Sequence, residues 1–75
     1  MAEEDLRLLN RLYLLFRTAI DEEKKAQKMY KEAMEICQDD ALKEVLKGFY
    51  EDEVEHEYKL LEQYELLRRR IGYTE

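Results

Sequence analysis

Proline is absent from this 75-residue sequence, glycine occurs twice and cysteine once. Because proline and glycine interrupt helices, their scarcity beside 43% charged residues predicts long unbroken helices instead of strands and turns. One cysteine excludes an internal disulfide bond and suits a reducing cytosol. A chain of this length forms one small domain, residues 1–75, which buries only about 60% of its unfolded surface. We therefore expect a bound metal or a partner chain to supply the missing stability.

Long apolar runs and basic surfaces are missing too. No apolar stretch approaches the ~20 residues of a membrane span, and the acidic start 2–5 does not resemble a signal peptide. The net charge of −6 argues against nucleic-acid binding, which needs a basic stripe. The one basic run, 68–70, is expected in the last turn of a helix, where positive charge is favourable. We expect a soluble, cytoplasmic protein.

Apolar or small residues recur in two series, mostly at steps of three or four residues. The first series is Leu9, Leu12, Phe16, Ala19, Ala26, Tyr30, Ala33 and Cys37. The second is Leu42, Leu46, Phe49, Leu60, Tyr64, Leu67 and Ile71. Such steps place side chains on one face of a helix, so the pattern predicts helices over about 4–36 and about 40–70.

The connection between these helices is short. Asp39 or Asp40 is expected to cap the second helix at its N-terminus, and Gly72 to end it. Helices joined by so short a turn are antiparallel neighbours. The predicted fold is therefore an all-α antiparallel hairpin. A single hairpin encloses no interior, so we expect it to dimerise into a four-helix bundle.

Ionisable residues interrupt both apolar series. Glu23 fills the gap in the first, and Glu53 and His56 fill the gap in the second. Glu23 and Glu53 each lie about fifteen residues from the turn, hence about 22 Å from it and at one level of the hairpin. His56 projects one turn further along the same face. Because an unpaired buried carboxylate is costly, a metal ion is the expected partner.

A two-fold dimer would double this set to four glutamates and two histidines, which is the ligand set of ferritin-like di-metal bundles. A non-metal interpretation stays open. Glutamate makes up 14 of the 75 residues, so chance alone places one three positions before a histidine about once in five. Glu23 also lies in a charged run, 21–25, typical of a solvated face. The apolar face of the first helix is also compatible with a position one residue further along, on Ile20 and Gln27, and that position favours the non-metal interpretation.

Two further residues accompany these three. Tyr30 lies two turns after Glu23, where it is either a hydrogen-bond partner or electron donor beside the metals or a packing residue. Cys37 lies too far along the helix to reach the metals and is expected to be a small buried hydrophobe.

The spacing Glu23-x6-Tyr30 followed by Glu53-x2-His56 resembles the di-iron motifs of the ferritin and rubrerythrin superfamily. The closer similarity is to the encapsulated ferritins, whose chains are two-helix hairpins, and it covers about residues 15–65. The residues with counterparts in that family are Glu23, Tyr30, Cys37, Asp39, Leu42, Lys43, Leu46, Glu53, Glu55 and His56.

This resemblance implies a ferroxidase that binds two iron ions per dimer interface, oxidises Fe(II) with dioxygen or peroxide, and passes Fe(III) to storage. It implies rings of dimers inside an encapsulin shell. It also implies Glu53 as the bridging ligand, Glu23 and His56 as terminal ligands, and Glu22 as part of a second, metal-attracting site. That site departs from the family at Lys25, and Met29 stands where the family has tryptophan.

No segment after residue 72 resembles an encapsulin-targeting peptide. Three alternatives remain open: a truncated chain, a domain normally fused to the shell protein, and a protein that does not enter a shell. Three rival functions also remain. They are a helical oligomerisation module without chemistry, a rubrerythrin-like peroxide reductase, which usually needs four cysteines for its electron site, and storage of zinc or another divalent metal at the same ligands.

Overall fold

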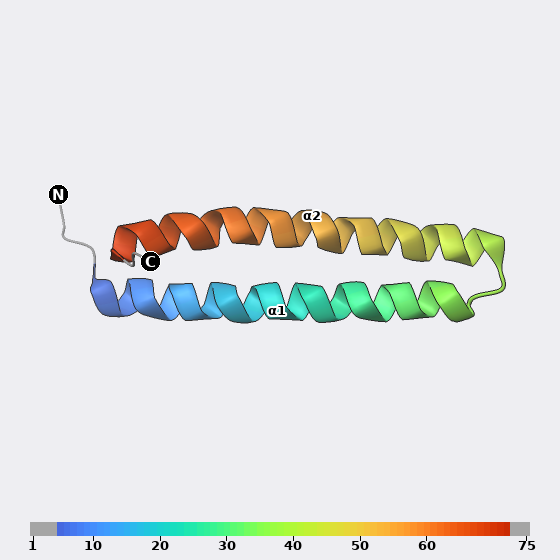
Figure 1. Cartoon of the computed structure of the whole chain (residues 1–75), viewed down its shortest axis with the longest axis horizontal. Coiled ribbons are helices and arrows are strands. Elements are labelled where there is room, and N and C mark those ends of the chain that lie inside the picture. The colour runs from blue at the N-terminus through green and yellow to red at the C-terminus, as the bar shows by residue number, and fades with distance from the viewer. Residues whose placement is uncertain (1–4, 73–75) are drawn as a thin grey trace.

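The computed structural model describes residues 5–72, and that part of the chain forms two helices. Helix α1 spans Leu6–Ile36 and helix α2 spans Asp40–Ile71. They lie side by side and antiparallel, joined by a short turn (Figure 1). The predicted all-α hairpin and its turn are confirmed. The first helix begins at Leu6, after the N-cap Asp5, whereas the predicted start at about residue 4 lies outside the described residues. Within residues 5–72, neither helix has an apolar stretch that could cross a membrane.

The ends of α2 are set by local hydrogen bonds. The Asp39 carboxylate accepts a hydrogen bond from the backbone N–H of Leu42 at 3.0 Å, so Asp39 and not its neighbour is the N-cap. Gly72 adopts a left-handed conformation with φ of 92°, and its N–H donates to the carbonyls of Arg68 and Arg69 at 3.1 Å. A residue with a β-carbon would be strained there, which explains why glycine ends the helix.

The seam between the two helices is narrower than the sequence predicts. Leu9, Ile20 and Leu67 are its buried apolar residues. Leu12 and Phe49, which were predicted in the same seam, expose 45% and 47% of their surface. Within one chain, the predicted stripe of three- and four-residue steps is therefore wider than one neighbouring helix can cover.

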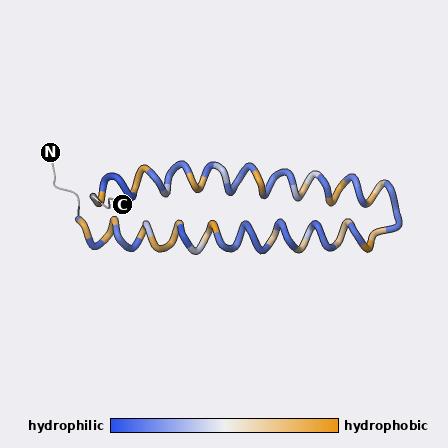
Figure 2. The backbone as a smooth tube through the Cα atoms, in the orientation of Figure 1, coloured by the Kyte–Doolittle hydropathy of each residue, from blue (hydrophilic) through white to orange (hydrophobic). Residues whose placement is uncertain are grey.

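The less covered part of the stripe lies along one side of the hairpin, and we call this side the open flank. Its members follow each other at seven-residue steps: Leu12, Ala19, Ala26 and Ala33 on α1, and Leu42, Phe49 and His56 on α2. Apolar residues recur along the whole length of both helices (Figure 2). Hollows on this flank lie near both ends of the hairpin, one bordered by Ala33 and Leu42 and the other by Leu12 and Leu60. An isolated hairpin therefore leaves a long apolar face in water.

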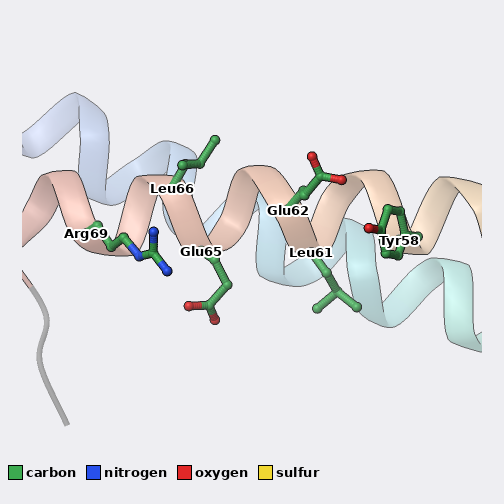
Figure 3. A pocket seen from close by; sticks show the side chains of 6 residues that line it. All are labelled: Tyr58, Leu61, Glu62, Glu65, Leu66 and Arg69. Atoms are coloured by element: carbon green, nitrogen blue, oxygen red, sulfur yellow. The ribbon is translucent and has the colours of Figure 1, made fainter.

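A second group of exposed apolar side chains lies on α2. Tyr58, Leu61 and Leu66 expose 66%, 40% and 48% of their surfaces. They border a shallow hollow with Glu62, Glu65 and Arg69 on the outside of α2, away from α1 (Figure 3). This surface lies apart from the open flank.

Candidate metal centre

Glu23, Glu53 and His56 meet halfway along the hairpin. Each offers one ligand atom, and these atoms all lie within 4.8 Å of one another. The Nδ1 atom of His56 lies 3.8 Å from Oε2 of Glu23 and 3.8 Å from Oε2 of Glu53. The prediction that the two glutamates share one level is confirmed, since α1 and α2 bring them together from opposite sides of the turn.

The two carboxylates are more buried than the imidazole. The side chains of Glu23 and Glu53 are 22% and 21% exposed, whereas that of His56 is 56% exposed. Oε2 of Glu23 is itself buried and accepts no hydrogen bond. Its 3.8 Å separation from the imidazole nitrogen is too long for one. A buried carboxylate oxygen without a partner is costly, and the cost disappears when a cation binds.

The donor set fits a transition-metal ion. Two carboxylates and one imidazole provide oxygen and nitrogen ligands, which suit iron, manganese and zinc. Among residues 5–72 the cluster contains three such residues, and the exposed imidazole leaves it open towards the open flank. A complete coordination shell therefore needs further ligands from outside this chain.

A second polar pair lies beside the cluster. The Gln27 side-chain amide donates a hydrogen bond of 2.6 Å to Oε1 of Glu57 and a longer one of 3.4 Å to the carbonyl oxygen of Glu53. Sequence reasoning missed this pair. The available signal was spacing, since Gln27 lies four residues after Glu23 and Glu57 four residues after Glu53. Because its carboxylate is held by the amide, Glu57 stays outside the ligand group.

The other residues singled out from the sequence lie outside the cluster. The Tyr30 ring packs against the Phe49 ring, with centroids 5.7 Å apart, so packing is the role that the structure assigns to it. Glu22 is exposed and pairs with Lys25 at 3.2 Å. Cys37 is half-buried at the turn, and its sulfur donates to the Asp39 carbonyl at 3.3 Å.

The fold and the cluster together define an all-α hairpin protein with a carboxylate–imidazole ligand set on one face. Comparison with protein families agrees with this class: the Ferritin-like domain matches residues 7–70. The chain belongs to this family. The predicted membership of the ferritin superfamily is thus confirmed, while the closer similarity to encapsulated ferritins stays a prediction. No curated protein and no solved structure matches the chain.

Proposed function

We propose that this chain is a ferroxidase that oxidises Fe(II) to Fe(III) at a di-iron centre shared by two copies, for iron storage and detoxification. The observation that carries the proposal is the buried, unpartnered Oε2 of Glu23 beside Glu53 and His56. A plain oligomerisation module has no use for such an oxygen, since an apolar residue would pack there at lower cost.

The second copy completes the centre through the open flank. A two-fold axis passing through the cluster doubles three ligands to six and places both exposed imidazoles inside the interface. The cluster lies about 22 Å from the turn and about 25 Å from the ends of the helices. An antiparallel copy centred on the axis therefore covers the whole flank. The hollow beside Leu42 then faces the hollow beside Leu12 of the other copy.

The side chains have separate tasks in this centre. Glu53 would hold both iron ions, an assignment that rests on the resemblance to encapsulated ferritins, and Glu23 and His56 would each hold one. The carboxylates stabilise Fe(III) more than Fe(II), which favours loss of the electron. Two Fe(II) ions, the substrate, lose one electron each, and dioxygen takes up both electrons and two protons to become hydrogen peroxide. Where peroxide is the oxidant, it is reduced to water.

The surroundings of the centre belong to the same proposal. Glu22, exposed one position before Glu23, is the candidate for attracting metal ions. Tyr30 is the candidate electron donor, although its ring contact with Phe49 assigns it packing as well. We propose a ring-like oligomer of dimers as the assembly and the interior of an encapsulin shell in the cytoplasm as the place of storage. The support for both is the family resemblance.

Crystals soaked in Fe(II) without oxygen test the centre directly. Anomalous scattering measured on both sides of the iron absorption edge should show two iron positions between Glu23, Glu53 and His56 of paired chains. A signal that does not change across the edge identifies another divalent metal and favours metal storage. No density at this position would favour the oligomerisation module.

A further inference from the structure

Two tyrosines stack on each other across the helix seam. Tyr13 of α1 and Tyr64 of α2 have ring centroids 4.5 Å apart and ring planes inclined by 14°. The Tyr64 hydroxyl donates a hydrogen bond of 2.7 Å to the Tyr13 hydroxyl. Both side chains are half-buried. The two phenol groups therefore point the same way, with their hydroxyl ends together.

This arrangement brings reactive carbon atoms together. In a phenoxyl radical the unpaired electron is shared among the oxygen, the two ring carbons next to the C–O carbon and the para carbon. In tyrosine the para carbon already carries the side-chain methylene, so coupling takes place at the ortho carbons. Because the two hydroxyl oxygens of Tyr13 and Tyr64 lie 2.7 Å apart, these ortho carbons of the two rings are neighbours too. A bond between these carbons also requires the rings to rotate out of the stack, and both side chains are only half-buried.

We propose that Tyr13 and Tyr64 are an oxidative modification site, at which a peroxide-class oxidant joins α1 and α2 through a dityrosine bond. Each phenol loses one hydrogen atom, the two ortho carbons form a carbon–carbon bond, and each displaced ring hydrogen moves to oxygen and restores the phenol. One hydrogen peroxide takes up both hydrogen atoms and becomes two water molecules. The source of this peroxide, the dioxygen reduced at the iron centre, rests on the proposed function.

The bond would connect α1 and α2 covalently, towards the end of the hairpin at which α1 begins and α2 ends. Tyr13 and Tyr64 are 51 positions apart in the chain, so the bond closes a long loop in the unfolded state. A chain with one cysteine has no disulfide available for this purpose. The pair also lies about 12–15 Å along the helices from the cluster, close enough to intercept oxidants that leave it.

The test uses the complete chain without metal, oxidised by light, tris(bipyridine)ruthenium and persulfate. We expect a product that migrates as a monomer on a denaturing gel, has lost two hydrogen atoms, and shows dityrosine fluorescence. Tryptic digestion should link peptide 12–17 to peptide 60–68. Because the loop is closed, the midpoint of thermal unfolding should rise by ~10 °C or more. Iron plays no part, so this result is independent of the ferroxidase assay.

The matched variants are Tyr64→Phe and Tyr13→Phe, which keep the ring and remove the hydroxyl. Each should reduce the linked peptide to background, with helical content unchanged by circular dichroism. Tyr58→Phe is the control, since Tyr58 lies on the outside of α2 and should leave the yield unchanged (Figure 3). Absence of the linked peptide in the unaltered chain overturns the proposal, as does a main product that joins two chains through Tyr58. An unchanged midpoint of thermal unfolding would contradict the claim that the bond stabilises the hairpin.

Discussion

Gln27 on α1 holds the carboxylate of Glu57 on α2 with a hydrogen bond of 2.6 Å, directly beside the candidate metal ligands. The bond joins the two helices where the seam is polar. It also keeps Glu57 away from the cluster, so that Glu23 and Glu53 are the carboxylates that face His56. The polar stretch of the seam is thus divided into one satisfied pair and one group with an unpartnered oxygen.

Replacing Gln27 by alanine should destabilise the hairpin. The half-buried carboxylate of Glu57 would lose its donor, which costs about 1–3 kcal/mol in the free energy of unfolding. Thermal unfolding followed by circular dichroism measures the loss. Gln63→Ala is the control, because Gln63 is exposed on α2. The double change Gln27→Leu with Glu57→Leu should recover stability, since both polar partners are removed together. A Gln27→Ala variant as stable as the parent would show that the bond does not form in solution.

Removing a ligand should slow iron oxidation strongly. Glu53→Ala and His56→Ala should each lower the rate of Fe(II) oxidation by about 100-fold or more, since even partners of metal ligands contribute 10–100-fold. Ferric absorbance after mixing with Fe(II) and air measures the rate. Glu55→Ala is the control, because Glu55 is exposed and pairs with Lys59. Without metal, Glu53→Ala should be at least as stable as the parent. Full activity in both ligand variants would rule out the proposed centre.

Metal binding should join chains and stabilise them at the same time. A cation at the interface offsets the repulsion among four carboxylates, so Fe(II) under anaerobic conditions should convert smaller species to dimers or larger rings. Metal at a hundred times its dissociation constant adds about 2.7 kcal/mol to the free energy of unfolding. Light scattering and thermal melts, each with and without metal, report the two effects. The same additions to His56→Ala should change neither quantity. A parent chain that responds no more than this variant would contradict an interfacial site.

A charge on the open flank should prevent assembly of the centre. Phe49→Glu places a carboxylate where a second copy is expected to pack, and burying it costs several kcal/mol. We expect this variant to keep its helices, to stay smaller in light scattering, and to lose metal-dependent association. Leu66→Glu is the matched control, since Leu66 lies on the outside of α2, away from the open flank. If Leu66→Glu blocked association and Phe49→Glu did not, the interface would lie on the outside of α2.

The fold and the candidate site differ in how far local sequence predicts them. Asp39 and Gly72 mark the ends of α2 because capping depends on side chains and backbone within a few residues. Glu23 and Glu53 could be placed at one level because helical rise and a short turn determine height along a hairpin. The Tyr13–Tyr64 stack and the Gln27–Glu57 bond were not predictable in this way, since each depends on the rotation of one helix against the other.

By itself, the sequence determined two long helices, their caps, their antiparallel pairing and the common height of Glu23, Glu53 and His56, because periodicity and rise act within each helix. Only the tertiary structure decided which stripe of α1 faces α2. Ala19 and Ile20 lie on adjacent faces of α1, about 100° apart around the helix axis, and both faces are apolar enough to pack against α2. Packing against α2 buries Ile20 and turns Leu12, Phe49 and His56 towards the open flank.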